Sequence, residues 1–418
     1  MSIRIMFSTL RHSSLMPAMV LLQVALACAI LCNVLFLVWQ QMEPMLAPSG
    51  VAQNELIMVD QVASSQRAWT AAEVRAGEDA LRQTPGVRAA SAAFGLPMVS
   101  SVLVDVSLQG TTGAKVGVDA YMGEGLVNTL GLQLVAGRDF LPTDYSVYGL
   151  TGDSQSLEGQ GVPDPIIITQ ALADKLFGGG SAVGKMLTDP GERDGKDPGY
   201  RVVGVVKHLL RVQLGLATDG RADYAVLLAK RIGTASLLSY AVRVDPTMRE
   251  AAMRGVHKTI QSQFGVMMGP HPIAKFNFYS ELRDAAFKSQ RAALWLFAGV
   301  TLAVVIVTVI GIMGLTGFWV QKRTRQIGIR RALGARRADI LRYFLAENVL
   351  IVGIGVAVGM LLAFLGNRLL MHYYELQHLP LTYLPLGAIA MLLLGQLAVL
   401  SPALRAAAVP PVVATRSV

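Results

Sequence analysis

Residues 179–185 follow the spacing of a phosphate-binding loop, G-x-x-x-x-G-K, whose backbone amides and lysine hold the phosphates of a nucleotide. The residue after Lys185 is Met186, and a methionine has no hydroxyl with which to bind Mg²⁺. The run 188–191 (TDPG) stops any helix that should follow, and the loop comes after a predicted helix over 170–177 instead of a strand. We therefore interpret the motif as a turn that leads back into a sheet, and we expect no nucleotide site and no cofactor on this chain.

Metal-binding and nucleophilic side chains are scarce. The two cysteines, Cys28 and Cys32, lie in one apolar run near the N-terminus, which argues against a disulfide framework, a cysteine-ligated zinc site and a cysteine nucleophile. None of the six histidines has the H-x-x-x-H spacing of a metal site, and His208, His257 and His271 have no evident acidic or nucleophilic partner. We predict no catalytic residue and no metal site, so the chain is not expected to be an enzyme.

The positive charge of the chain is concentrated in its apolar parts. Of 418 residues, 53% are hydrophobic and 16% are charged, compared with roughly 25% charged in soluble domains. The window 43–289 holds 23 Lys and Arg against 25 Asp and Glu, whereas the rest of the chain holds 14 against 3. A nucleic-acid-binding protein carries its positive charge on a folded basic face. Basic residues beside apolar segments are typical of membrane proteins, so we expect a membrane as a partner and no nucleic acid.

Four apolar segments are long enough to cross a membrane. The first, Met16–Trp39, carries no charge over 24 residues and would span roughly 36 Å as a helix, more than the hydrocarbon core of about 30 Å. Ala25-Leu26-Ala27 resembles a signal-peptide cleavage site and, with Cys28, a weak lipobox. The apolar run nevertheless continues well beyond the roughly 7–15 residues of a signal peptide. We predict transmembrane helices over 16–40, 290–320, 347–370 and 383–401.

Basic residues determine the predicted orientation of these spans. The segment 321–346 carries eight Lys and Arg, so the positive-inside rule places this loop in the cytoplasm. The two ends, 1–15 and 402–418, carry two arginines each and are placed there as well. The loop 371–382 has no Lys or Arg and is placed outside. The segment 41–289 is therefore predicted to be a large extracytoplasmic domain.

This outer domain has the mixed pattern of an α/β fold. The capping-box sequence 70–73 opens a predicted helix that ends near Pro85. Asp245 and the proline after it open a second helix that reaches about Phe264. The stretch 143–165, rich in Gly, Ser and Asp, is predicted to be a loop that could divide two subdomains. Apolar alternation and short apolar runs predict strands over 102–108, 166–168, 200–206, 224–228 and 240–244.

Two runs after the second span resemble a known family. They are 311–315 (GIMGL) and 323–335 (RTRQIGIRRALGA), and they are similar to the loop motifs of the MacB/FtsX-like ABC transporter permeases. The order of parts, one span, a large outer domain and three further spans, is also similar. Other resembling runs are 135–140, 166–177, 183–185, 200–206, 402–407 and 410–416.

The spans and the resemblance together imply an α-helical membrane protein with four transmembrane helices and a large mixed α/β periplasmic domain. It is expected to lie multi-pass in the bacterial inner (cytoplasmic) membrane, with both termini inside (N-in and C-in).

The segment 327–334 is predicted to be a short amphipathic coupling helix that docks in an ATPase subunit, as the resemblance implies. The alternative is a basic anchor that snorkels at the membrane face and needs no partner. Gln326 stands where the family usually has Glu, so it keeps hydrogen-bonding capacity and loses a charge. The predicted contact residues are Ile327, Gly328, Ile329, Arg330, Arg331, Ala332, Leu333 and Gly334.

The resemblance implies a permease subunit that couples ATP hydrolysis by a separate ATPase subunit to motion of the periplasmic domain, and so drives export of the tripartite efflux type. Only 15 residues precede the first span, so we expect ATP and Mg²⁺ to bind on a partner chain. The expected partners are an ABC ATPase subunit, a second permease copy (in a homodimer or a paralogous heterodimer), a periplasmic adaptor protein and an outer-membrane channel. The alternatives are an FtsX-like transmembrane regulator of cell-wall hydrolases and a lipoprotein-releasing permease.

Three features of the spans predict helix contacts. Gly355 and Gly359 form a small-x-x-x-small face that could let two helices approach closely. Cys28 and Cys32 share one face of the first helix, where we interpret them as inert, small apolar residues. A helix that continues from about 280 to 320 would be stiff enough to carry motion between an ATPase and the outer domain.

Overall fold

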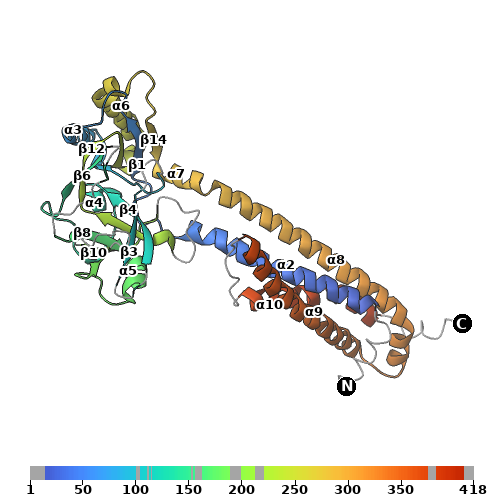
Figure 1. The fold of residues 1–418 in the computed structure, drawn as a ribbon. Helices are drawn as coiled ribbons and strands as arrows, with labels where there is room; N and C mark the ends of the chain where they lie inside the picture. The colour runs from blue at the N-terminus through green and yellow to red at the C-terminus, as the bar shows by residue number, and fades with distance from the viewer. Residues whose placement is uncertain are drawn as a thin grey trace. The chain divides into compact units, whose positions relative to one another are not determined.

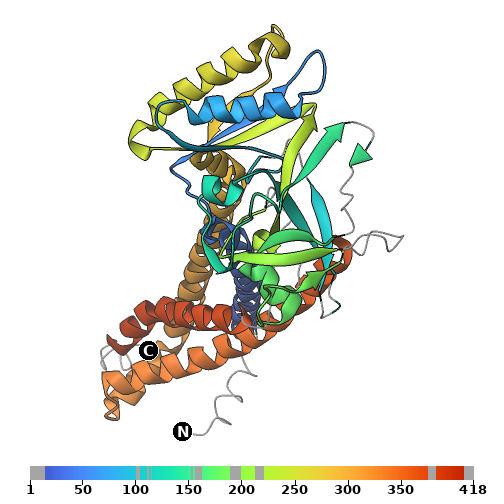
Figure 2. The same ribbon diagram turned by 90° about the vertical axis from the view of Figure 1, so that its left-hand side faces the viewer.

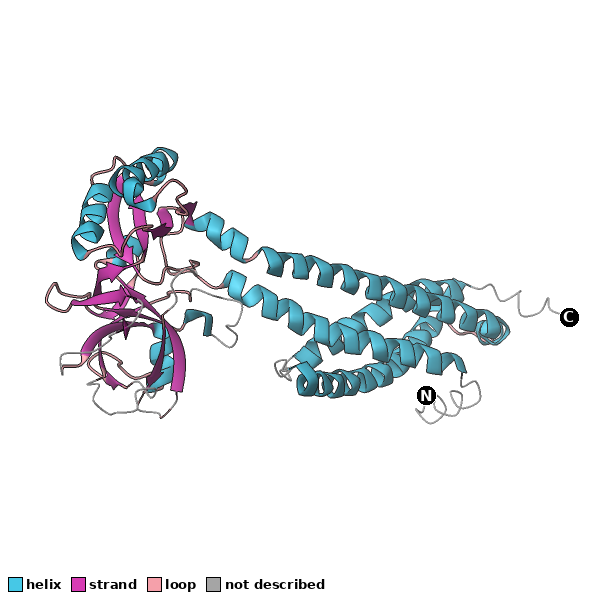
Figure 3. Cartoon of the chain, turned by 45° about the horizontal axis from the view of Figure 1, so that its top comes forward, coloured by secondary structure: helices cyan, strands magenta, loops and turns pink. Residues whose placement is uncertain are grey.

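The computed structural model divides the chain into two compact units, which we call the core domain (Pro44–Ser289) and the membrane unit (Met1–Glu43 with Gln290–Val418) (Figure 1). In the described part of the chain the strands all belong to the core domain, and the membrane unit is built from long helices (Figure 3). The structure describes residues 15–99, 104–110, 113, 115–151, 154–155, 162–188, 199–211, 221–374 and 383–408.

A four-stranded antiparallel sheet with two helices forms one part of the core domain. Its strand order is β14-β1-β13-β2 among the described residues. The helices α3 and α6 pack against each other beside this sheet (Figure 2). The ring centroids of Trp69 and Phe264 lie 4.9 Å apart in their shared core. The elements are β1 Leu56–Ala63, α3 Ala71–Arg82, β2 Val87–Ala93, β13 Leu237–Val244, α6 Arg249–Met268 and β14 Lys275–Phe278.

Both predicted helices of this part are present, with one difference at the start of α6. The Thr70 hydroxyl accepts a hydrogen bond from the Glu73 amide, and the Glu73 carboxylate accepts one from the Thr70 amide, so the predicted capping box is confirmed. Asp245 caps a 3₁₀ turn, η2 Pro246–Met248, and the α-helix begins only after it. The apolar face of α6 also extends one turn beyond Phe264, because Met268 is buried.

A mixed seven-stranded sheet forms the second part of the core domain, with the order β3-β4-β11-β8-β10-β5 and with β9 paired to β10. The β8–β10 and β4–β11 pairs are parallel, and the β11–β8 and β3–β4 pairs are antiparallel. The predicted strand over 200–206 has those same limits in the structure. The strands are β3 Asp105–Gln109, β4 Lys115–Met122, β5 Leu134–Gly137, β8 Asp164–Thr169, β9 Met186–Leu187, β10 Tyr200–Val206 and β11 Ala225–Leu228. The helical elements of the core domain outside the first part are α4 Leu126–Leu130, α5 Gln170–Phe177, η1 Arg221–Asp223 and α7 Tyr279–Ala286.

The prediction that 143–165 is a loop is wrong for the part of this stretch that the structure describes. The stretch contains β6 Ser146–Thr151 and β7 Ser154–Gln155, which form a third sheet with β12 Lys230–Ala235. Tyr148 is buried there, and its ring centroid lies 5.9 Å from that of Phe94. This aromatic contact anchors a strand in a stretch whose polar composition is typical of a loop. The seven-stranded sheet lies, in the chain, between the two groups of strands that build the four-stranded sheet.

Each predicted span lies within one long helix of the membrane unit. The four helices are long and apolar enough to cross a membrane, with candidate spans over Pro17–Glu43, Lys288–Arg330, Arg337–Arg368 and Tyr383–Ala408. The last helix continues into the predicted tail 402–418 as far as Ala408. The helices are α2 Leu15–Leu46, α8 Lys288–Ala332, α9 Arg337–Tyr374 and α10 Tyr383–Ala408.

Two of the predicted helix contacts are present. Gly355 and Gly359 of α9 lie against α2, where a Cβ on Gly355 would fall 2.8 Å from a methyl group of Val24. The small-residue face is therefore a real packing surface. Cys28 and Cys32 are both buried and unpaired; Cys28 lies against Gly359, and Cys32 lies against a glycine of α10.

The continuous helix predicted from about 280 to 320 is interrupted. The helix α7 ends at Ala286 and α8 begins at Lys288, because Phe287 leaves the helical conformation. The Phe287 side chain is buried with Leu210 and Ala222 of the core domain. The two helices are therefore separated by this one residue, whose ring is buried.

Candidate coupling site

The predicted coupling residues do not form a separate short helix. The helix α8 runs without a break through Gln326 to Ala332 and includes Gly328; it ends before Gly334. This glycine has a φ of +101°, a left-handed conformation that ends helices and that other residues rarely adopt. The residues between Gly334 and Arg337 then reverse the chain into α9. The coupling segment is therefore the end of a 45-residue helix.

The end of α8 has two different faces. Ile327 and Gly328 are buried, whereas Ile329 is 47% exposed and Leu333, in the turn, is 83% exposed. Among the described residues, no apolar neighbour covers this leucine. Arg330, Ala332 and Gly334 are exposed as well, and the side chain of Arg331 lies outside the described residues.

A buried ion pair joins the ends of α8 and α9. The Arg323 guanidinium lies 3.2 Å from the carboxylate of Glu347, which is 1% exposed. The same guanidinium lies over the Trp319 ring, 4.5 Å from its centroid. A carboxylate buried this deeply needs its partner, so the pair fixes the direction in which the Arg323 side chain extends.

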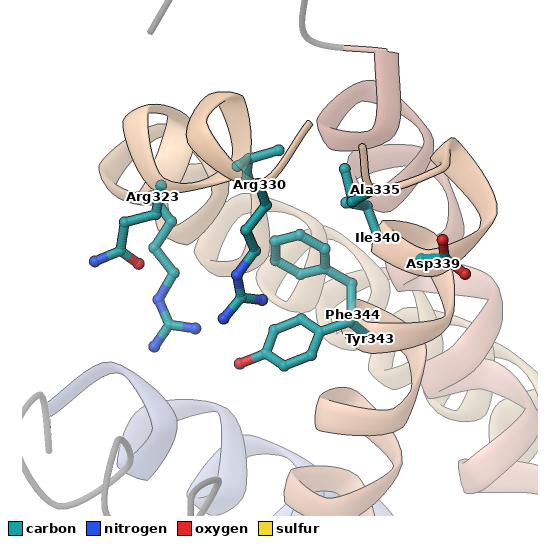
Figure 4. Close-up of a pocket in the computed structure, with 9 residues that line it drawn as sticks. Arg323, Arg330, Ala335, Asp339, Ile340, Tyr343 and Phe344 are labelled. Atoms are coloured by element: carbon teal, nitrogen blue, oxygen red, sulfur yellow. The ribbon is translucent and has the colours of Figure 1, made fainter. Parts of the chain in front are cut away.

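A pocket of about 380 Å³ lies in the angle between the two helices (Figure 4). The side chains of Arg323 and Arg330 extend from α8 toward the side where the Tyr343 ring lies (Figure 4). The Arg330 guanidinium is 5.0 Å from the centroid of that ring, a cation–π distance. The lining residues are Arg323, Gln326, Ile327, Arg330, Ala335, Asp339, Ile340, Tyr343 and Phe344.

Sequence reasoning identified one wall of this pocket and missed the other. Gln326 and Ile327 were singled out from the α8 motif, but Tyr343 and Phe344 of α9 were not. The aromatic pair directly after Arg342, inside the basic segment, is the signal that points to this wall. Whether these two rings face α8 depends on the angle between α8 and α9, and this angle cannot be predicted from the sequence.

The core domain holds two titratable clusters that the sequence did not reveal. His208 does have an acidic partner, because its Nδ1 lies 2.7 Å from the Asp223 carboxylate. Burial raises the pKa of Asp223, while His208 and the Leu209 amide hydrogen-bond to the carboxylate and oppose that rise. The two residues are 15 positions apart, and this separation hid the pair from the sequence.

The second cluster lines a small cavity between α3 and β12. Burial raises the pKa of Glu78 to about 7. The Ala92 amide donates a 2.7 Å hydrogen bond to this carboxyl group, and Arg82 lies 3.7 Å away. Across the cavity the Arg231 guanidinium donates two hydrogen bonds to Glu124.

The turn that resembles a phosphate-binding loop leads into the sheet, as predicted. It follows α5 and enters β9, which pairs with β10. The Lys185 ammonium lies 4.6 Å from the ring centroid of Phe177, at the end of α5. This contact ties the turn to the helix before it.

Comparison with known families covers most of the chain. Residues 20–259 match the MacB-like periplasmic core domain, and residues 298–411 match the FtsX-like permease C-terminal domain. The chain belongs to the MacB/FtsX-like permease family. It is thus an ABC permease of the MacB type, with a mixed α/β core domain and four candidate transmembrane helices.

Curated relatives of this permease are longer than the chain. The macrolide export ATP-binding/permease protein MacB 1 of Aeromonas hydrophila is 30% identical over 345 residues, covering 79% of this chain and 48% of that protein. The MacB protein of Chromobacterium violaceum is 30% identical over 202 residues, covering 48% of this chain and 29% of that protein. The permease chain therefore spans half or less of the length of these relatives.

Solved structures of related domains also align with this permease. The periplasmic region of MacB from Actinobacillus actinomycetemcomitans is 11% identical, covers 59% of this chain and 98% of that chain, and gives a TM-score of 0.35. The extracellular domain of the ABC-type transporter YknZ from Gram-positive bacteria is 14% identical, covers 53% of this chain and 99% of that chain, and gives a TM-score of 0.33.

Proposed function

We propose that this permease couples ATP hydrolysis by an ABC ATPase subunit to motion of the core domain, and that this motion drives export. The observation that carries the proposal is the exposed apolar end of α8, where Leu333 is 83% exposed. An apolar side chain surrounded by arginines suits a groove on a partner protein, because burying it there removes its apolar surface from water.

The length of α8 supports a mechanical role. One helix extends from Lys288, at the end of the core domain, to Ala332 at the proposed ATPase contact. A continuous helix transmits displacement along its axis with little loss, since every turn is hydrogen-bonded to the next. Movement of the ATPase would reach the core domain through this helix.

The orientation and the partners belong to the same proposal. The basic segment 321–346 is placed in the cytoplasm by the positive-inside rule, so the chain would lie in the inner membrane with the core domain in the periplasm. ATP and Mg²⁺ would bind to the ATPase. A second permease copy, a periplasmic adaptor protein and an outer-membrane channel would complete a tripartite export assembly. The match of residues 20–259 to the MacB-like core supports export over the FtsX-like regulation of a cell-wall hydrolase and over lipoprotein release.

The variant Leu333→Asp tests the coupling contact. A carboxylate buried unpaired in a protein interface costs a few kcal/mol, so co-purification with the ATPase subunit should fall at least tenfold and transport-coupled ATP turnover should be lost. Membrane insertion should survive, because the residue lies beyond the apolar part of α8. Val266→Asp is the control, since Val266 is 88% exposed on α6 of the core domain, lies outside the candidate spans and belongs to no proposed contact.

If the segment 327–334 is only a membrane anchor, the charges of the basic segment 321–346 should matter more than Leu333. In that case the pair Arg336→Gln and Arg337→Gln, which removes two charges, should impair the chain more than Leu333→Asp. Normal assembly and turnover in Leu333→Asp would exclude the coupling contact.

A further inference from the structure

The pocket between α8 and α9 has a chemistry that contact with an ATPase does not explain. Its apolar lining comes from Ile327, Ile340 and Phe344, which are 5%, 6% and 3% exposed. Its basic lining comes from Arg323 and Arg330. A pocket that combines cations with buried apolar side chains suits an amphiphilic anion, whose charge and hydrocarbon parts need different surroundings.

The two arginines share one face of α8 and differ in how they are bound. They are seven residues apart, two turns of helix, so their side chains project in similar directions (Figure 4). Arg323 is held by Glu347. Arg330 stacks on the Tyr343 ring and, among the described residues, has no carboxylate within 4 Å. Its guanidinium is therefore free to pair with an anion.

The acidic residue of the pocket is already engaged. The Asp339 carboxylate accepts a 3.0 Å hydrogen bond from the Arg336 amide, at the start of α9. It lies on the opposite side of the pocket from Arg323 and Arg330 (Figure 4). Asp339 therefore neutralises neither guanidinium directly.

The position of the pocket relative to the apolar stretches of α8 and α9 indicates which anion it binds. Arg323 lies three residues after Val320, where the apolar stretch of α8 ends, and the apolar stretch of α9 begins at Val349. The pocket lies where both spans end, at the level of lipid headgroups. Basic pockets between helices at this level recognise the headgroups of anionic lipids.

We propose that this pocket binds one anionic phospholipid. The lipid phosphate lies between Arg323 and Arg330, and its glycerol and first acyl carbons lie against Ile340 and Phe344. Ile327 and Arg330 line the pocket and also belong to the predicted coupling residues, whereas Ile329 and Leu333 do not line it. The lipid therefore leaves the exposed side chain of Leu333 accessible. The inference requires only that the membrane unit spans a bilayer. Leu333 lies outside the pocket, so Leu333→Asp tests the coupling contact separately from the lipid.

Lipid retention by the full chain tests the proposal. The chain is reconstituted with equal amounts of phosphatidylglycerol and phosphatidylcholine, extracted in detergent, and analysed for bound lipid by native mass spectrometry. The native chain should retain phosphatidylglycerol preferentially. Arg330→Gln should reduce this preference about fivefold, the effect of one basic residue near an anionic lipid surface, and Arg330→Lys should keep most of it.

Arg337→Gln is the matched control, since this arginine belongs to the same basic segment and does not line the pocket. Equal losses in Arg330→Gln and Arg337→Gln would mean a diffuse charge effect and would overturn the proposal, as would an absence of preference in the native chain. Displacement of the lipid by millimolar inorganic phosphate would assign the site to free phosphate and overturn it as well. Unchanged thermal unfolding of Arg330→Gln separates lost binding from lost folding.

Discussion

Gly359 of α9 lies so close to Ala25 of α2 that a Cβ on the glycine would fall 2.6 Å from the Ala25 carbonyl oxygen. The next nearest atom would be the Cβ of Cys28, at 2.7 Å. Both neighbours belong to α2, and the nearer one is backbone, which cannot turn away as a side chain can. The first and third spans therefore pack closely at this point, and the close approach depends on the absence of a side chain at Gly359.

We expect Gly359→Ala to separate α2 from α9. The added methyl group requires α2 to move by several tenths of an ångström, and overpacking of this kind costs about 1–3 kcal/mol. The midpoint temperature of unfolding in detergent should fall by several degrees. Gly353→Ala, in the same helix, is the control, because in the described part of the chain no other element comes within 4 Å of its Cβ position. Equal midpoints for the two variants would contradict the close packing.

Local signals were sufficient to predict much of this fold. The capping box of Thr70 and Glu73 specifies the start of α3 through two hydrogen bonds that involve only neighbouring residues. The spans are as readily predicted, because their length and apolarity are properties of the chain itself.

Features that depend on distant partners were missed. The strand β6 exists because it pairs with β12, some 80 residues later, and its Gly- and Ser-rich neighbourhood resembles a loop. The pair of His208 and Asp223 joins residues from two elements. The pocket beside Arg330 depends on the angle between α8 and α9, which the sequence of neither helix determines.

The proposed orientation predicts opposite labelling of two exposed positions. Ser236 is exposed in the turn between β12 and β13, and Ala332 is exposed at the end of α8. In a background with Cys28 and Cys32 replaced by alanine, Ser236→Cys should react with a membrane-impermeant maleimide applied to the periplasm of cells with an intact inner membrane. Ala332→Cys should react only after that membrane is opened. The reverse pattern would show that the positive-inside rule fails for this chain.

The buried carboxyl group of Glu78 makes the stability of the core domain depend on pH. Its pKa rises from an ordinary value of 4.5 to about 7, chiefly because burial disfavours the charged form. The Ala92 amide and Arg82 favour ionisation, and Glu124 and Asp79 oppose it. A carboxyl group whose pKa is raised on folding supports stability below its unfolded pKa and loses that contribution as the pH rises toward its folded pKa.

We therefore expect Glu78→Gln to stabilise the core domain increasingly as the pH rises. The glutamine can still accept the Ala92 hydrogen bond, and it carries no charge to bury. The gain in the free energy of unfolding relative to the native chain should grow by about 2–3 kcal/mol between pH 5 and pH 8. Hydrogen exchange of the α3 and β2 amides in the full chain, at pH 5 and at pH 8, measures the free energy of unfolding of this part of the core domain.

A second glutamate of the same helix provides the control for this pH effect. Arg67 and Thr70 hydrogen-bond to Glu73 and lower its pKa to about 2, with the Arg67 hydrogen bond as the largest cause. A carboxyl group whose pKa is lowered on folding contributes its full stabilisation at pH values above its unfolded pKa of 4.5. This stabilisation is lost only as the pH falls below that value. The effect of Glu73→Gln should therefore be the same at pH 5 and pH 8. A pH-independent effect of Glu78→Gln over that interval would show that Glu78 is already ionised at pH 5, and that the paired arginine and amide outweigh its burial.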